Sequence, residues 1–270
     1  MKVVLLAAGY ATRLYPLTLT QPKPLLTVAG KPMIEYVLDN LAPVGGIERV
    51  YVVTNAKFAG HFQKWADGYR ATKSNLGFTI VNDGSTDDTN KLGAIGDLNL
   101  VITREKVDDD LVVVAGDNLF SESLGAYGGF CRSKRAPVLG IYDVGSLEQA
   151  KKYGVVDLDG EGRIVRFEEK PKQPASTLIG IALYYYPKNV VPMLRNFTRL
   201  ASESAVKTAE GISIMAPVSR DSPKGILSAR SSRRHSSTSA LAWFNSSRPE
   251  IIGYIILMLP STAARRMARS

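Results

Sequence analysis

An arginine and a lysine follow a run of small residues near the start of the chain, and this combination could hold phosphate. The run covers residues 6–9 and comes directly after an apolar segment with strand character. Small residues let backbone N–H groups approach an anion closely. Arg13 offers a planar fork for phosphate oxygens, and Lys23, between two prolines, offers a restricted point charge. Taken alone, these residues fit a phosphate site and a solvated turn equally well.

Two common phosphate-binding motifs do not describe this segment. A dinucleotide-binding fingerprint needs three glycines, but Ala11 and Leu14 stand where its second and third glycines would be. A P-loop needs Gly-Lys followed by Ser or Thr, and the chain contains no such string. A phosphate site here would therefore be of another type.

Longer strings around these residues resemble the sugar-1-phosphate nucleotidyltransferases, most closely the group named glucose-1-phosphate thymidylyltransferases. Residues 6–36 resemble the N-terminal signature of that family, which has a glycine where this chain has Ala11. We expect the loop to tolerate this small-for-small change. The resemblance extends over about three quarters of the chain and continues, in the right order and spacing, through Leu92–Asp97, Gly116–Asn118, Tyr153–Val156 and Phe167–Pro171.

The resemblance implies a Mg²⁺-dependent displacement at phosphorus. An oxygen of the sugar-1-phosphate attacks the α-phosphorus of a nucleoside triphosphate, and pyrophosphate leaves. The protein must align two polyanions and neutralise them, which explains the basic residues. The group it resembles most would use dTTP and glucose-1-phosphate. The resemblance implies that the catalytic residues are Arg13, Lys23 and Asp117.

The resemblance also assigns the subsites residue by residue. Asp117, after the apolar run Leu111–Ala115, would bind the Mg²⁺, although a lone Asp at a strand end is otherwise a cap or turn former. The nucleotide would contact Leu6, Ala7, Ala8, Gly9, Arg13, Lys23 and Gly93. The sugar phosphate would contact Tyr153, Gly154, Glu169 and Lys170.

The elements that must position these residues alternate between strand and helix. Apolar stripes with helical spacing occupy residues 34–41, 58–69 and 95–102. The pattern predicts an α/β fold of Rossmann-like character, in which helices cover both faces of a mostly parallel mixed sheet. This is the fold type of nucleotide-diphospho-sugar transferases, and ligands bind at the carboxyl ends of its strands. The expected strands are Val3–Ala7, Arg49–Thr54, Phe78–Val81, Leu111–Ala115 and Val138–Tyr142.

Composition divides the chain into a nucleotidyltransferase domain, residues 1–211, and a basic tail, residues 212–270. The tail holds nine Arg and Lys and 13 Ser, but only Asp221 and Glu250 as acids, and it shows no clear period. We expect it to be disordered or the product of a reading-frame shift. The alternative is a natural basic tail that binds nucleic acid or an acidic surface.

The tail lacks the second metal carboxylate of the family. Members carry an aromatic-Tyr/Phe-Asp-Ile-Gly string, but the nearest fragment here is Trp243–Ser246, with an amide in Asn245. Met215 stands where another family Asp would be. A frame shift explains both the basic charge of the tail and the missing Asp, whereas a natural basic tail explains only the charge. A second hypothesis for the function follows: a nucleotide- or sugar-phosphate-binding protein with impaired catalysis.

The remaining composition is that of an ordinary globular protein, with 45% hydrophobic and 22% charged residues. One cysteine, Cys131, excludes an internal disulfide and fits a reducing compartment, so we expect a cytoplasmic location. We expect no membrane partner, because the apolar stretch Ile251–Pro260 is too short to span a bilayer. We also expect no nucleic-acid partner, and the resemblance leaves room for a homo-oligomer.

Overall fold

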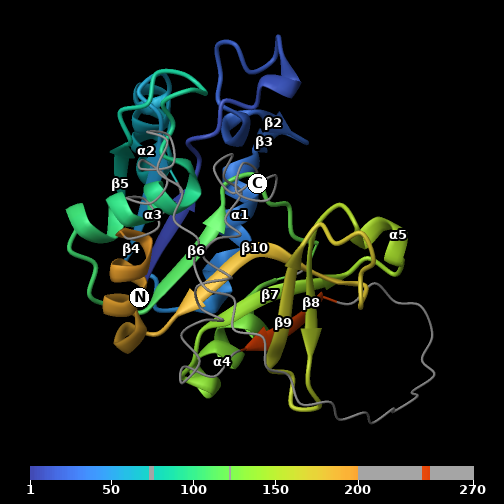
Figure 1. Ribbon diagram of the computed structural model, residues 1–270. Coiled ribbons are helices and arrows are strands. Elements are labelled where there is room, and N and C mark those ends of the chain that lie inside the picture. The colour runs from blue at the N-terminus through green and yellow to red at the C-terminus, as the bar shows by residue number, and fades with distance from the viewer. Residues whose placement is uncertain (73–75, 122, 200–238, 244–270) are drawn as a thin grey trace.

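A mixed sheet runs through the part of the chain that the computed structural model describes, residues 1–72, 76–121, 123–199 and 239–243 (Figure 1). Nine strands of these residues belong to it. Its order is β11 (Ser239–Trp243), β7 (Val138–Asp143), β10 (Leu178–Tyr186), β6 (Leu111–Ala115), β1 (Lys2–Leu6), β4 (Arg49–Thr54) and β5 (Gly77–Asn82); β8 (Gly154–Leu158) pairs with β10, and β9 (Ile164–Glu169) pairs with β8.

One half of the sheet is parallel. Strand β1 lies between β4 and β6 and pairs in parallel with both, and β4 pairs in parallel with β5. Val3, Val4 and Leu5 have no exposed surface, as expected for a strand that is covered on both faces. The carboxyl ends of these strands consequently meet at one edge.

The other half of the sheet is antiparallel. Strand β10 is antiparallel to both β6 and β7, and β8 forms a hairpin with β9. The five strands expected from β-branched runs are present as β1, β4, β5, β6 and β7, whereas β8, β9 and β10 were not expected from the sequence. Aromatic residues are typical of strands, so those at the end of β10, such as Tyr184 and Tyr186, could have indicated this strand.

Helices cover both faces, which confirms the predicted α/β fold of Rossmann-like character (Figure 1). The sheet is mixed as expected, but it is not mostly parallel, because β10 and the β8–β9 hairpin pair antiparallel. On one face, α1 (Met33–Leu41), α2 (Ala59–Thr72) and α4 (Gly125–Lys134) form a buried cluster with Val3 and Leu5 of β1. On the other face, α3 (Gly93–Arg104) and the helical residues 191–199 pack with Val4. The three expected helical stripes fall on α1, α2 and α3.

The short elements connect these layers. They comprise the 3-10 turns η1 (Thr12–Leu14), η2 (Lys23–Leu25), η3 (Ala42–Val44) and η4 (Lys188–Val190), the short helix α5 (Leu147–Ala150), and the small hairpin of β2 (Thr27–Val28) with β3 (Lys31–Pro32).

The tail enters the description only at residues 239–243, which form β11 and pair antiparallel with β7. The prediction of a disordered or frame-shifted tail concerns residues that otherwise lie outside the described part of the chain, and it stays a prediction. Among the described residues, the helices are too short or too polar to cross a bilayer.

Helix α4 and η3 make a close contact at Gly128 and Val44. A Cβ atom added at Gly128 would lie 2.8 Å from Val44 Cγ1 and 2.9 Å from the Val44 carbonyl oxygen. Gly129, the next residue of α4, has nothing within 4 Å of the same position. Only the first of the two glycines is therefore required by packing.

We expect Gly128→Ala to lower the free energy of unfolding by about 1–3 kcal/mol, because the backbone of Val44 must move to admit the methyl group. Gly129→Ala is the matched control and should raise stability by up to about 1 kcal/mol, since alanine favours the helix. Urea unfolding of both variants measures the difference. Equal stability of the two variants would contradict the packing argument.

Candidate active site

The small-residue run of the sequence forms the loop that leaves β1, and its backbone is fixed on both sides. Gly116 N donates to Leu6 O at 3.0 Å, and Ala7 N donates to Val53 O at 2.9 Å. Gly9 is exposed, and no atom lies within 4 Å of where its Cβ would be. The loop therefore presents backbone to an open space at the carboxyl edge of the sheet, as a site for an anionic ligand requires.

Asn55 holds this loop and was not identified from the sequence. Its side chain is fully buried, and its Nδ2 donates to Ala8 O at 3.0 Å. Its Oδ1 accepts a hydrogen bond from Phe58 N at 3.1 Å, at the turn that leads into α2. An Asn directly after an apolar strand and before a helical stripe was the signal that could have indicated this cap.

Ala11 adopts a left-handed backbone conformation, with φ 48° and ψ 42°. Thr18, which is almost fully buried, donates its hydroxyl to Ala11 O at 2.9 Å and fixes this conformation. Glycine adopts such angles without strain, whereas a Cβ atom adds about 1–2 kcal/mol. This strain explains why the family pattern places a glycine here. The loop accommodates alanine at the cost of that strain.

Lys23 and Asp117 meet at the same edge. Lys23 Nζ lies 2.6 Å from Asp117 Oδ2, and both side chains are about one third exposed. Asp117 follows β6, which pairs with β1, and Lys23 begins η2. A Cβ at Gly116 would lie 3.3 Å from Leu6 O and 3.4 Å from Pro24 Cγ, so the small residue permits this close approach.

Arg13 and Gly93, the remaining predicted nucleotide contacts, lie on two further segments. Arg13 is exposed in η1 on the same loop as Gly9 and forms no ion pair within the described part of the chain. Gly93 begins α3 with φ 73°, a conformation that favours glycine. The structure thus places Arg13 where its guanidinium is open to an anion.

The four predicted sugar-phosphate residues come together where β8 begins and β9 ends. Gly154 is opposite Glu169 in the strand register. Lys170 N donates to Tyr153 O at 2.9 Å, and Lys170 Nζ lies 2.9 Å from Glu169 Oε1. Lys170 has φ 47°, which turns the chain sharply after β9. The antiparallel pairing therefore brings together residues that are well separated in sequence.

Strand β10 connects the two groups of residues. Asn118, next to Asp117, donates its Nδ2 to Ile181 O of β10 at 2.7 Å. Two residues earlier on β10, Ile179 is paired with Val155 of β8. The β8–β9 hairpin and the edge that carries Asp117 are thus attached to the same strand.

Asp117 is suited to a divalent cation that the substrate helps to hold. Its carboxylate is partly exposed at the carboxyl edge of the sheet, and Mg²⁺ prefers hard oxygen ligands. Within the described residues, no group of three or more His, Cys, Asp or Glu side chains could hold a metal ion. Phosphate oxygens would have to supply further ligands, which is common at nucleotide sites.

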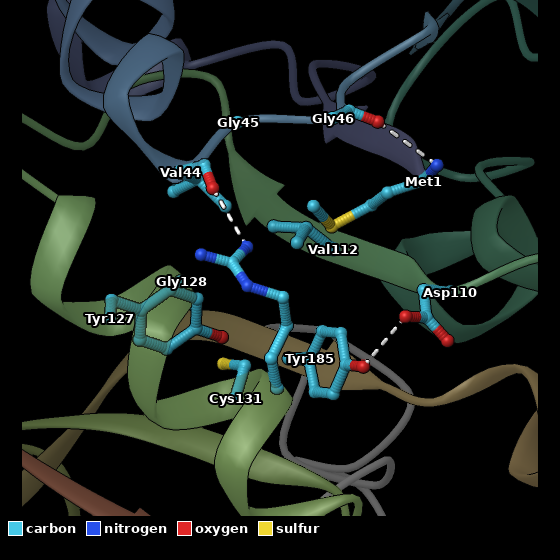
Figure 2. Close-up of a pocket in the computed structure, with 11 residues that line it drawn as sticks. Met1, Val44, Gly45, Gly46, Asp110, Val112, Tyr127, Gly128, Cys131 and Tyr185 are labelled. Carbon is cyan, nitrogen blue, oxygen red and sulfur yellow. Dashed lines mark hydrogen bonds between the residues drawn. The ribbon is translucent and has the colours of Figure 1, made fainter.

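A separate cavity of about 420 Å³ lies at the opposite edge of the sheet (Figure 2). Met1 and Asp110, which precede β1 and β6, line it together with Tyr185 near the end of β10. The Tyr185 hydroxyl donates to Asp110 Oδ2 at 2.9 Å, and burial raises the pKa of Cys131 to about 12, so this thiol stays protonated. The cavity contains none of the predicted site residues.

The chain matches the family model described as nucleotidyl transferase over residues 2–224. The mannose-1-phosphate guanylyltransferase of Mycobacterium tuberculosis is 33% identical over 204 residues, which are 75% of this chain and 53% of that protein. The UTP–glucose-1-phosphate uridylyltransferase of Haloferax volcanii is 31% identical over 186 residues, covering 69% of this chain and 72% of that protein.

A third relative is the glucose-1-phosphate thymidylyltransferase of Mycolicibacterium smegmatis, 29% identical over 202 residues, which cover 74% of this chain and 66% of that protein. Among solved structures, a UDP-glucose pyrophosphorylase complexed with UDP-glucose has the same fold. Its TM-score is 0.61 at 18% identity, with 99% of this chain and 98% of that chain covered.

The chain therefore belongs to the nucleotidyl transferase family, and its relatives are sugar-1-phosphate nucleotidyltransferases. This confirms the family indicated by the sequence strings. The chain spans about half the length of several relatives that it matches. The relatives' names cover guanylyl, uridylyl and thymidylyl transfer, so family membership alone leaves the base open.

We expect Ala11→Gly to raise the free energy of unfolding by up to about 1 kcal/mol, because glycine relieves the left-handed strain at φ 48°. Ala8→Gly in the same loop is the control. Ala8 is buried and has no positive φ, so this change should lower stability by about 0.5–1 kcal/mol. Thermal unfolding of both variants tests the assignment, and a destabilised Ala11→Gly would contradict it.

Proposed function

We propose that this chain transfers a nucleotidyl group from a nucleoside triphosphate to a hexose-1-phosphate and releases pyrophosphate. The observation that carries the proposal is the meeting of Lys23 and Asp117, 2.6 Å apart, beside the open loop at Gly9. A second cation, Lys170, stands on the hairpin attached to the same sheet. Two separate basic groups suit a reaction between two polyanions.

Each group of residues has a distinct part in this reaction. The loop backbone near Gly9, with Arg13 and Lys23, holds the triphosphate and offsets its charge. Lys170 binds the sugar phosphate, and Glu169 accepts hydrogen bonds from sugar hydroxyls. An oxygen of the sugar phosphate then forms a bond to the α-phosphorus, and the bond to the β-phosphate breaks. The electron pair of that bond leaves with pyrophosphate.

The ion pair between Lys23 and Asp117 keeps the charges of the unliganded site balanced. A triphosphate would attract Lys23 and free the Asp117 carboxylate for a cation. Mg²⁺, when held by Asp117 and phosphate oxygens, supplies further neutralisation of the phosphates. The exchange of one partner for another avoids leaving either charge unpaired in a partly buried site.

The proposed substrates are dTTP and glucose-1-phosphate, and the proposed location is the cytoplasm. Support for the substrates comes from the sequence resemblance and from the relative in Mycolicibacterium smegmatis that is named for thymidylyl transfer. The single cysteine supports a reducing compartment. Neither proposal affects the chemistry at phosphorus, which is the same for every base and sugar.

A second candidate function is binding of the same ligands with little transfer. It is favoured by one observation: within the described residues, no group of three or more His, Cys, Asp or Glu side chains could hold a metal ion. A cation held by one carboxylate and substrate oxygens is held weakly, so we expect such a site to need Mg²⁺ at roughly millimolar concentration.

The two candidates differ in pyrophosphate release. We expect the chain to release pyrophosphate when Mg²⁺, a triphosphate from the set dTTP, UTP and GTP, and glucose-1-phosphate or mannose-1-phosphate are present together. Asp117→Asn should lower this rate at least about tenfold, since it removes a charge used in the transition state. A ligand-induced rise in melting temperature without pyrophosphate release would favour the binding protein instead.

Lys23 and Lys170 should affect different substrates. We expect Lys23→Ala to weaken triphosphate binding at least about tenfold, or about 1.4 kcal/mol. Lys170→Ala should raise the KM for the sugar-1-phosphate and leave triphosphate affinity unchanged. Calorimetry with the triphosphate and steady-state kinetics separate these effects, with Lys64→Ala on the exposed face of α2 as the control. Equal effects of both changes on both substrates would contradict the two-subsite arrangement.

A further inference from the structure

Two carboxyl groups, one buried and one half-buried, meet next to the nucleotide loop. Asp97 lies on α3, is only 4% exposed, and is in hydrogen-bonding contact with the side chain of Asp83. Asp83 begins the loop that runs from β5 to α3, residues 83–92. Two ionised carboxylates in such a place would repel each other strongly, because the surrounding medium screens them poorly.

The surroundings favour the neutral form of Asp97 rather than that of Asp83. Among the described residues, no hydrogen-bond donor and no cation contacts the Asp97 carboxyl, and its Oδ1 is buried without a partner. Asp83, by contrast, accepts hydrogen bonds from Ser85 N and Ser85 Oγ, both at 2.7 Å. Donors stabilise a carboxylate, and the Asp97 carboxyl has none, so its surroundings favour the proton on Asp97.

The electrostatics agree with this assignment. Burial raises the pKa of Asp97 to about 8, and the neighbouring Asp83 charge acts in the same direction. Helix α3 packs on β1 and β4 through an apolar cluster, and Tyr51 of β4 is a titratable residue in this cluster. The loop also carries Asp87 and Asp88, whose charges act on Tyr10.

The pair is linked to the nucleotide loop through Ser85. Ser85 is 2% exposed, and its carbonyl oxygen accepts a hydrogen bond from Ala56 N at 2.9 Å. Asn55, which precedes Ala56, donates its Nδ2 to Ala8 O at 3.0 Å in the loop that leaves β1. A continuous set of polar contacts therefore joins α3, the loop after β5 and the loop that leaves β1.

We propose that Asp97 is a positioning residue, which keeps its carboxyl proton and donates it to Asp83. The neutral acid holds the loop at Asp83 and Ser85 against α3, and Ser85 in turn holds the nucleotide loop through Ala56 and Asn55. This inference rests on the proposed function, because it gives the triphosphate site an internal support that works only while Asp97 is protonated. Ionisation of Asp97 places two negative charges together and loosens the wall of the site.

The first test compares wild type with Asp97→Asn, which keeps the shape and a hydrogen-bond donor but cannot ionise. The pKa of Asp97 is raised on folding, so its favourable contribution is complete below the unfolded value of 3.8 and is lost as pH rises to about 8. We expect the two proteins to melt at similar temperatures near pH 4, and Asp97→Asn to melt higher at pH 8–9. The measurement needs no ligand and is made in EDTA.

The second test measures positioning. The dissociation constant of wild type for dTTP, UTP or GTP with Mg²⁺ should rise at least about fivefold between pH 7 and pH 9, since an acid with a pKa of about 8 is mostly ionised at pH 9. Asp97→Asn should show only the change that comes from titration of the nucleotide itself. A purely structural role for Asp97 would move the melting temperature and leave this difference at zero.

Several outcomes would overturn the inference. The same pH dependence of melting in both proteins would show that Asp97 does not hold a proton, and the same pH dependence of affinity would show that it does not position the site. If Asp97→Asn fails to fold, carbon-13 NMR of the Asp97 carboxyl in wild type decides, and a titration midpoint below pH 5 refutes the proposal. If wild type binds none of the three triphosphates at pH 7, the proposed function fails, while the melting series still decides the protonation of Asp97.

Discussion

The parallel pairing of β1 with β4 and β6 is the constraint from which the geometry of the site follows. Because the three strands run in the same direction, Leu6, Thr54 and Ala115 end at one edge of the sheet. The segments that follow them carry Gly9, Asn55 and Asp117. The interiors of these strands are fully buried on both faces, so the edge is the first place where the chain can present backbone and charge to a ligand.

Two charged pairs at this edge show how burial decides the protonation of a group. Lys23 and Asp117 have opposite charges and remain about one third exposed, so a ligand can separate the pair. Asp83 and Asp97 have the same kind of side chain, and Asp97 is buried, so a shared proton replaces one charge. One pair is thus available for binding, and the other supports the structure around it.

The antiparallel half of the sheet positions the second group of predicted site residues, those at the β8–β9 hairpin. Strand β10 pairs with β6 at one end and with β8 nearer its other end, so it carries the β8–β9 hairpin beside the edge with Asp117. Because β10 is attached both to the edge with Asp117 and to the β8–β9 hairpin, it fixes the separation of Lys23 and Lys170. The proposed reaction between two bound phosphates requires such a fixed separation.

The sequence by itself determined the family, the buried strands and the residues that carry charge. Apolar runs such as Leu111–Ala115 predict a buried strand wherever they lie, and strings around Lys23 and Asp117 indicated their chemistry. The β8–β9 hairpin and β10 were missed, although they position Glu169 and Lys170, because antiparallel pairing joins segments whose local patterns do not reveal their partners.

Only the tertiary structure decided which residues hold the site in place. The sequence around Asn55 could indicate a cap, but neither Asn55 nor Asp97 has a neighbouring pattern that names the segment it contacts, and both are buried. Their roles depend on Ala8 and Asp83, which come from other segments. The energy of a buried polar group is set by the atoms around it in space, and chain order does not specify those atoms.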